Sequence, residues 1–478
     1  MTQRLRTSAC LLVLACSAFA AQARDRDYLP PEVQRALTAQ RVPATGVSIY
    51  VREIGRDEPL VSYNSTIPRN PASTMKVVTT WTALERLGPA YTWQTRAYAA
   101  GPVRDGTLDG DLVLVGGGDP YLTADRWWGF VNAIRQAGIE RVTGDLVIDN
   151  GYFEPQGDDR GAFDNKPFST YNVLPDALLV NFQTVTFELV PDPVARTLSA
   201  TAWPRPSNLE MTSAVQVDRG PCRRGGGGVA VGTPDGPSGA RVEFTGRYPA
   251  SCGPIAFTRA VMRAPDYAYG TFRTFWEQSG GRLDGGWRIG ALPAGAKLIT
   301  SQDSLSLAEV IRLVNKYSSN TMARQLLLTL GAEAYGRPGT TAGGRKVITD
   351  FLASQGISIP DLVLENGSGL SREERITAAG LADVLAAAWR SQYMPEFAAS
   401  LPLSATDGTL RRRFKSPGMQ GRLRMKTGTL DGVSALAGYV NAASGRTYVA
   451  VVIVNSPGAQ AGAGPAVQTA LVQWVFAQ

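Results

Sequence analysis

A long β-rich section divides the helical parts of this chain. From about Tyr91 to Arg273, short β-favouring runs such as GDLVLVGGGDP and RVEFTGRYP alternate with glycine and proline, as strands and turns do. Outside this section, apolar residues recur at helical spacing over four stretches, about Ala72–Leu87, Leu305–Leu330, Thr341–Gln355 and Ala378–Arg390. This order predicts a helical framework that is interrupted by an inserted region.

The C-terminal part adds strands to that framework. LAGYVNAASGRTYVAVVIVNS predicts two strands joined by a glycine-containing turn, and an apolar helix follows to Gln478. Helices with a C-terminal antiparallel sheet predict an α+β core domain, formed by residues 24–90 and 274–478. Within the inserted region, residues 91–273, the Pro191-Asp192-Pro193 turn predicts a hairpin in a small β module of about residues 183–252.

The first 23 residues predict a secretory signal peptide. Arg4 and Arg6 precede an apolar run, and Ala21-Gln22-Ala23 provides a small-x-small cleavage site. The run is shorter than the roughly 20 apolar residues of a membrane span, which argues against a transmembrane anchor. Lipid attachment at Cys16 is the alternative to simple removal. We therefore expect a periplasmic protein whose mature chain has no integral membrane anchor.

Export also determines how the four cysteines are interpreted. Cys10 and Cys16 lie in the signal segment, which leaves Cys222 and Cys252 in the mature chain. In an oxidising compartment a disulfide between them is the default, and two unpaired buried thiols are the alternative. The spacing of these cysteines suits no metal site, and the chain has no histidine, so we expect no zinc site.

The charge distribution gives no support for nucleic-acid binding. The formal net charge is +7, but the basic residues are scattered along the chain. Their one run, Arg411-Arg412-Arg413, is short and lacks interleaved aromatic residues.

A serine and a lysine stand three places apart in PASTMKVVTT. Ser73 falls in the first turn of the predicted helix, and Lys76 lies one turn further along the same face, within reach of the hydroxyl. Because there is no histidine, a Ser-His-Asp triad is impossible, and a neutral lysine is the documented substitute for the base. Burial and a nearby cation can lower the lysine pKa enough. A helix cap followed by a snorkelling lysine would also explain the pair.

Two further motifs follow in a fixed order. NKYSSNT places Ser318, Ser319 and Asn320 at a break between helical stretches, where Ser318 and Asn320 can both face a cleft. RMKTGTL places Lys426, Thr427, Gly428 and Thr429 at the head of a strand, where glycine leaves room for a substrate. Taken singly, an N-cap cluster and a turn would account for them.

Together, Ser-x-x-Lys, Ser-x-Asn and Lys-Thr-Gly resemble the motif set of penicillin-binding proteins and serine β-lactamases. The long insertion and the stretches GDLVLVGGGDP, ENGSGLSR and TDGTLRRRF make the chain similar to class C low-molecular-mass penicillin-binding proteins, the D-alanyl-D-alanine carboxypeptidases/endopeptidases. The resemblance covers nearly the whole mature chain. It departs at Ser319 and at Asn366, where an aspartate is expected, and the second departure bears on the contacts of that loop.

The resemblance implies an acyl-enzyme mechanism on peptidoglycan stem peptides, with no cofactor. Ser73 attacks the carbonyl between two D-alanines, Lys76 takes its proton, and water later releases the acyl group. Ser318 relays a proton to the leaving nitrogen, and Asn320 holds the substrate backbone. β-Lactams acylate the same serine and remain bound as covalent inhibitors.

The third motif completes the implied site. Lys426 supplies positive charge that keeps Lys76 neutral, and the hydroxyls of Thr427 and Thr429 bind the terminal carboxylate. The backbone N–H groups of Ser73 and Thr429 form the oxyanion hole.

Two other functions share part of this pattern. A serine β-lactamase would have the same motifs, but the long insertion fits it poorly, and we find no short loop with a glutamate to direct the hydrolytic water. A catalytically silent peptidoglycan-binding scaffold would keep the fold, but the motif residues are all intact.

Overall fold

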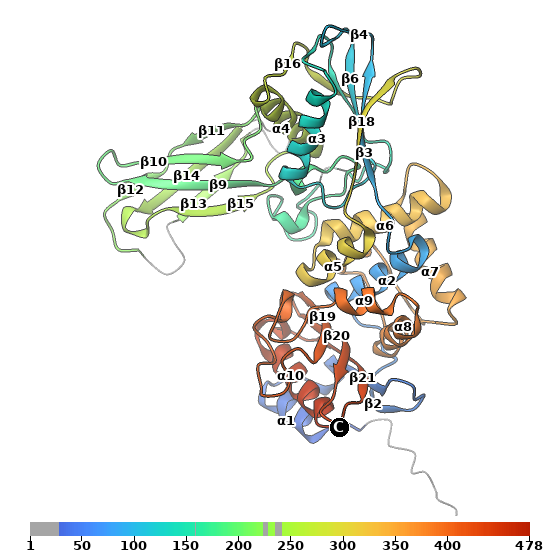
Figure 1. Cartoon of the computed structure of the whole chain (residues 1–478). Coiled ribbons are helices and arrows are strands. Elements are labelled where there is room, and N and C mark those ends of the chain that lie inside the picture. Colours follow the sequence, from blue (N-terminus) through green and yellow to red (C-terminus); the bar gives the residue numbers. More distant parts are fainter. Residues whose placement is uncertain (1–27, 158, 223–227, 235–240) are drawn as a thin grey trace, which may run out of the picture.

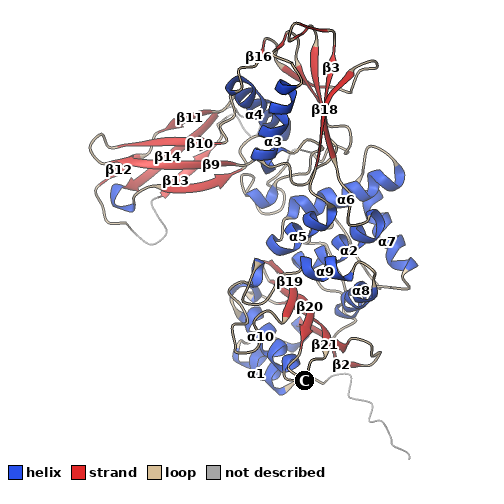
Figure 2. Cartoon of the chain, in the orientation of Figure 1, coloured by secondary structure: helices blue, strands red, loops and turns tan. Residues whose placement is uncertain are grey.

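The computed structural model describes residues 28–478 except 158, 223–227 and 235–240. The expected signal segment and Cys16 lie outside the described residues. Figure 1 shows three parts in succession: a C-terminal sheet with two helices, a central group of helices, and the long middle section, from which a β module projects to one side. The secondary structure follows these parts, with most of the helix in the central group (Figure 2). The predicted α+β class is confirmed.

An antiparallel sheet of five strands forms the base of the core. Its order is β19-β20-β21-β1-β2, with β1 at Val47–Glu53, β2 at Pro59–Tyr63, β19 at Leu423–Leu430, β20 at Val433–Asn441 and β21 at Thr447–Asn455. Side chains alternate between the two faces of a strand, and both faces of β21 are apolar. Val449, Val451 and Ile453 face one buried cluster, and Ala450, Val452 and Val454 face the other.

Helices cover both faces of this sheet, which is why β20 and β21 are mostly apolar on both faces. On one face lie α1 (Pro31–Ala39) and α10 (Ala463–Phe476). On the other face α8 (Ala378–Arg390) packs against β1 and β21. The predicted C-terminal strand pair, its closing helix and the helix at Ala378–Arg390 are confirmed.

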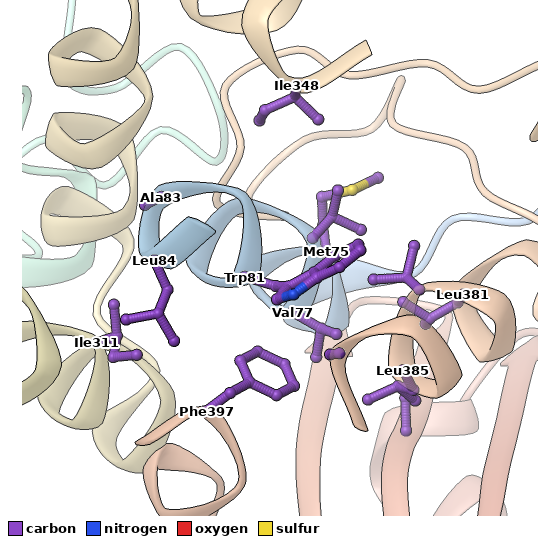
Figure 3. Close-up of a cluster of buried hydrophobic side chains, with 14 of the residues drawn as sticks. Met75, Val77, Trp81, Ala83, Leu84, Ile311, Ile348, Leu381, Leu385 and Phe397 are labelled. Carbon is purple, nitrogen blue, oxygen red and sulfur yellow. The ribbon is translucent and has the colours of Figure 1, made fainter. Parts of the chain in front are cut away.

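The central helices bury a large apolar cluster around α2. The remaining members are α2 (Lys76–Leu87), α5 (Leu307–Tyr317), α6 (Asn320–Tyr335), α7 (Thr341–Ser354) and α9 (Met394–Ser400). Figure 3 shows side chains of these helices converging on α2. The Trp81 ring meets Phe351 of α7 edge to face at 4.8 Å between ring centres. This packing buries α2 from its first residue, and with it the side chain of Lys76.

The middle section begins with a mixed sheet of order β17-β8-β6-β3-β18. Its strands are β3 (Gln94–Ala100), β6 (Asp111–Val115), β8 (Leu146–Asp149), β17 (Trp287–Ile289) and β18 (Lys297–Asp303). The helices α3 (Ala124–Gln136) and α4 (Ala264–Gln278) pack together beside it. A small sheet joins β4 (Val103–Arg104), β5 (Thr107–Leu108), β7 (Arg141–Val142) and β16 (Arg282–Leu283). Since β17 and β18 pair with strands of the expected insertion, the β-rich section extends by pairing to Asp303.

Two small sheets form the β module. The first has the order β10-β9-β15, with β9 at Val185–Asp192, β10 at Thr197–Trp203 and β15 at Ile255–Arg259. The second joins β11 (Glu210–Ser213), β12 (Gln216–Asp218), β13 (Gly228–Gly232) and β14 (Arg241–Pro249). The rings of Phe187 and Phe244 pack between the sheets, 5.3 Å apart. The predicted hairpin and the predicted disulfide between Cys222 and Cys252 are both present.

Candidate active site

The turn that carries Ser73 is held rigidly before α2 begins. Ser73 lies in a short 3₁₀ helix, η2 (Ala72–Met75), and α2 follows directly at Lys76. Ala72 has a left-handed backbone (φ 46°), and its N–H donates to Oδ1 of Asn70 at 2.9 Å. The amide of Asn70 in turn donates to the Ser371 carbonyl at 2.8 Å. The serine hydroxyl is therefore presented from a fixed and half-buried position.

Three oxygen atoms surround the amine of Lys76. Its Nζ lies 2.9 Å from Ser73 Oγ and 2.7 Å from Asn320 Oδ1, and it also contacts the Ser368 carbonyl oxygen. The Asn320 and Ser368 oxygens can only accept hydrogen bonds, so they take up the two N–H groups of a neutral lysine. The lone pair is then left for the Ser73 hydroxyl, which can donate.

Burial makes the neutral form of Lys76 the favoured one. Its side chain is 0% exposed, and burial lowers its pKa well below the usual value for lysine. The charges of Lys426 and Arg324 lower it further, whereas Glu374 raises it.

The break between α5 and α6 presents Ser318 and Asn320. Ser318 ends α5 in a left-handed conformation, with φ 60° and ψ 38°. Ser319 instead caps α6, and its Oγ accepts the Met322 N–H at 3.4 Å. Asn320 is the first residue of α6, and its Nδ2 donates to the Tyr171 carbonyl at 3.2 Å. Since the middle residue of the motif serves the helix cap, a serine there suffices.

The edge strand β19 brings Lys426 to the same place. Lys426 is 0% exposed, and its Nζ donates to Ser318 Oγ and to the Thr427 carbonyl, each at 2.8 Å. Burial lowers the pKa of Lys426 to about 7. Gly428 lies against the turn before α2, and Thr429 is exposed beyond it. The hydroxyl of Thr427 donates to that of Thr409 at 2.8 Å.

Two hydrogen-bond chains therefore link most of the predicted site residues. One runs from Ser73 through Lys76 to Asn320, and the other from Ser318 through Lys426 to Thr427. Gly428 joins the two by contact with Ser73. The structure brings these residues together, while their chemical roles stay predictions.

An ion pair between a buried lysine and a half-buried aspartate lies behind the site and was missed by sequence reasoning. Lys316, near the end of α5, donates from Nζ to both carboxylate oxygens of Asp407 at 2.8 and 2.7 Å and to the Leu401 carbonyl at 2.6 Å. The pair connects the helix end beside Ser318 to the segment that carries Thr409. The only sequence signal was TDGTLRRRF, which contains Asp407.

The ENGSGLSR loop forms another wall of the site. Asn366 accepts from the N–H and hydroxyl of Ser368 at 3.0 and 2.6 Å, and its amide donates to the Leu370 carbonyl at 3.0 Å. Asparagine thus holds the loop where an aspartate was expected, and it adds a donor. Gly369 (φ 78°) lies so close to the Ala72 carbonyl that a side chain would collide with it. Beyond the loop lie two charged groups that the sequence did not indicate, the buried Glu374 and the half-buried Arg324.

A hollow of about 290 Å³ lies between this loop and the inserted region. Phe163 and Asn172 line it from the insertion, and Arg324 and Leu370 line it from the core. The Arg372 guanidinium stacks over the Phe163 ring at 4.8 Å. Residues of both parts therefore line this hollow.

The described residues offer neither a metal-binding cluster nor a membrane-spanning helix. Across the part of the chain that the structure describes, no three Cys, Asp or Glu side chains gather where they could hold a metal ion. Among the helices of the described residues, none has the length and apolar character that crossing a bilayer requires.

Known proteins are similar to this chain in sequence and in fold. The model of the D-Ala-D-Ala carboxypeptidase 3 (S13) family matches residues 29–478. A D-alanyl-D-alanine carboxypeptidase of Actinomadura sp. strain R39 is 31% identical over 428 residues, which cover 86% of this chain and 76% of the relative.

Solved structures agree on the fold. The crystal structure of penicillin binding protein 4 (dacB) from Haemophilus influenzae aligns with a TM-score of 0.78 at 23% identity, covering 93% of this chain and 99% of the other. The same protein complexed with a β-lactam aligns with a TM-score of 0.75, at the same identity and coverage.

Proposed function

Because the chain belongs to the D-Ala-D-Ala carboxypeptidase 3 (S13) family and is a serine-type DD-carboxypeptidase, we propose that Ser73 is its nucleophile and Lys76 its general base. The observation that carries this proposal is the 2.9 Å contact between Lys76 Nζ and Ser73 Oγ. The other two partners of this amine can only accept hydrogen bonds, so the lysine lone pair faces the one hydroxyl that can give up a proton.

The reaction then proceeds in two steps. Ser73 Oγ attacks the carbonyl carbon of the penultimate D-alanine while Lys76 takes the hydroxyl proton. Collapse of the tetrahedral intermediate breaks the peptide bond. Ser318, hydrogen-bonded to Lys426 at 2.8 Å, passes its proton to the departing nitrogen and takes up from Lys76 the proton that came from Ser73. Water hydrolyses the resulting ester by the reverse proton route. The backbone N–H groups of Ser73 and Thr429 stabilise the oxyanion.

The proposed substrate is a peptidoglycan stem peptide that ends in D-alanyl-D-alanine. Lys426 and the hydroxyls of Thr427 and Thr429 bind the terminal carboxylate, and Asn320 holds the peptide backbone. Gly428 leaves the edge of β19 open beside Ser73. Cleavage of a D-alanyl crosslink is the same acyl transfer with a longer leaving group, so the proposal includes endopeptidase activity.

β-Lactams are the proposed covalent inhibitors. A β-lactam complex is known for the Haemophilus protein, which shares the fold. In this chain the strained amide carbonyl would be attacked by Ser73, and the ester would persist because its hydrolysis is slow. No cofactor, metal or nucleic acid has a part in the proposal.

The inserted region contributes to the site in this proposal. Three carbonyl oxygens, those of Tyr171, Val173 and Asp176, accept hydrogen bonds from Asn320, Thr321 and Gln325 at 3.2, 3.0 and 3.2 Å. We place the catalytic domain at residues 24–90 and 274–478 and the insertion at residues 91–273, with β16–β18 packed as its continuation. The first turns of α6 are held by the insertion.

We place the mature protein in the periplasm, after removal of residues 1–23. The disulfide between Cys222 and Cys252 supports an oxidising compartment.

A labelled penicillin tests the nucleophile. The purified mature protein and Ser73→Ala are incubated with a fluorescent penicillin, and the adduct is followed by gel and mass spectrometry over hours. Release of D-alanine from a stem peptide is measured in parallel. A lasting adduct and D-alanine release in the wild type alone support the proposal. Rapid turnover of the drug would indicate a β-lactamase, and neither adduct nor turnover would indicate a silent scaffold.

A further inference from the structure

Glu374 is a buried carboxyl group that the mechanism above does not use. Its side chain is 0% exposed. One oxygen, Oε1, accepts three consecutive backbone N–H groups, those of Glu365, Asn366 and Gly367, at 3.3, 3.1 and 3.1 Å. Among the described residues the other oxygen, Oε2, has no hydrogen-bond partner although it is buried. A group so costly to bury needs a reason to be there.

The peptide segment that Glu374 holds continues directly into the active site. The Gly367 carbonyl accepts the Thr79 hydroxyl of α2 at 2.7 Å, and the next carbonyl, that of Ser368, accepts Lys76 Nζ. Gly369 then packs against the backbone of Ser73. The three N–H groups that Glu374 binds lie on one side of this segment. Holding them fixes the direction of the Gly367 and Ser368 carbonyls on the other side.

The charge of Glu374 also reaches the lysine. Three charged groups act on Lys76: Lys426 from β19, Arg324 from α6 and Glu374 from the loop. The two cations lower the pKa of Lys76, and Glu374 is the group that raises it. The influence is mutual. Lys76 lowers the pKa of Glu374, and Glu374 raises the pKa of Arg324.

A base in this position must be neutral and yet strong enough to take a proton. Burial and two cations favour neutrality, but each also makes the amine a weaker acceptor. General bases work best when their pKa lies near the working pH. The carboxyl group of Glu374 offsets the effect of the cations on the pKa of Lys76. The Ser368 carbonyl accepts one N–H group of the lysine and so fixes the direction of the lone pair.

We propose that Glu374 is a positioning residue of this active site, which aims the Ser368 carbonyl at Lys76 and strengthens that lysine as the acceptor of the Ser73 proton. The inference rests on the proposed roles of Ser73 and Lys76. It adds a residue 298 positions away from the base that touches neither substrate nor nucleophile.

Two variants separate the two parts of this role. Glu374→Gln keeps an oxygen that can accept the three N–H groups but removes the negative charge. Glu374→Leu removes both. Glu373→Gln is the matched control, because it removes the same charge from the adjacent, exposed position. Each full-length mature protein is acylated with a fluorescent penicillin at a series of pH values, and the second-order rate constant is measured.

The expected results differ in kind. In Glu374→Gln the acidic limb of the pH profile moves to lower pH by roughly one unit, because Lys76 loses the negative charge that favours its protonated form. Glu374→Leu acylates about a hundredfold more slowly, because the loop carbonyls lose their direction. Glu373→Gln follows the wild-type profile.

Other outcomes would overturn the inference. A Glu374→Gln profile that superimposes on that of the wild type contradicts the effect on Lys76, whatever happens to Glu374→Leu. Thermal melting of each variant shows whether Glu374→Leu folds, and Glu374→Gln decides the question if it does not. A wild-type protein that forms no adduct would overturn the proposed function itself, so the two failures are distinct.

Discussion

A Cβ atom added to Gly428 would lie 2.5 Å from the carbonyl oxygen of Pro71. The edge strand β19 and the turn that holds Ser73 therefore meet backbone to backbone, and the absence of a side chain at one position sets their separation. The Lys-Thr-Gly motif therefore needs its glycine here for contact with the turn that carries Ser73, in addition to the proposed role of leaving room for a substrate.

Gly428→Ala should push β19 away from η2. Overpacking of this kind costs about 1–3 kcal/mol of unfolding free energy, and displacement of the reacting groups by about 1 Å should slow acylation roughly a hundredfold. Denaturant unfolding and penicillin labelling measure the two effects. Gly228→Ala is the matched strand control, since nothing lies within 4 Å of its added Cβ. Equal labelling of both variants would contradict the contact.

Asp407→Ala should destabilise the helix end beside Ser318. It leaves the 6%-exposed side chain of Lys316 without its anion, and partial exposure of Asp407 limits the loss to about 2–3 kcal/mol. Denaturant titration gives the value. Asp350→Ala breaks the exposed pair of Lys346 and Asp350 on α7 and should cost much less, because water screens the interaction of exposed charges. Similar losses of unfolding free energy in both variants would show that the pair of Lys316 and Asp407 does not stabilise the fold more than an exposed pair does.

The buried Lys426 predicts a pH-dependent stability. Its pKa is lowered in the fold to about 7, whereas an unfolded lysine titrates near 10.4. Between these values the unfolded chain binds more protons than the folded one, so the unfolding free energy due to this residue rises with pH. Relative to Lys426→Met, the wild type should gain stability from pH 7 to pH 9.5 in denaturant titrations. A constant difference would mean that Lys426 titrates normally.

Loss of the disulfide should affect stability and leave the chemistry intact. The bond between Cys222 and Cys252 closes a 30-residue separation within the β module, and the double serine variant should lose about 3–4 kcal/mol on the chain-entropy model. Calorimetry under non-reducing conditions measures the change. Labelling by penicillin should keep its wild-type rate, because Ser73 lies in η2, which is outside the β module. Slower labelling would reveal coupling between module and site.

The local residue pattern was sufficient to predict features that depend on neighbouring residues only. Ala378–Arg390 is apolar at helical spacing and is a helix with those bounds, and the Ser318–Asn320 break falls where α5 ends and α6 begins. The three motifs could be joined only through their resemblance to a known set, because no periodicity relates Ser73 to Lys426.

The remaining features depend on pairs that are distant in sequence. Lys316 meets Asp407 across 91 positions, and nothing near either residue indicates the other. Glu374 follows another glutamate, and only the fold shows that one is exposed and the other buried. β17 has three residues, too few for alternation to identify a strand, so its pairing with β8 is evident only from the fold.

The chain leaves the helical core at β3 and returns to it along β18, and these strands pair so that Gln94 lies opposite Asp303. By connectivity alone, the whole section between them could be exchanged for a tight hairpin without moving the ends. The bonds from Asn320, Thr321 and Gln325 to the carbonyls of residues 171–176 set a limit on such an exchange. A chimera that keeps α6 must keep that peptide segment too, so in evolution the two are expected to have been inherited as one unit.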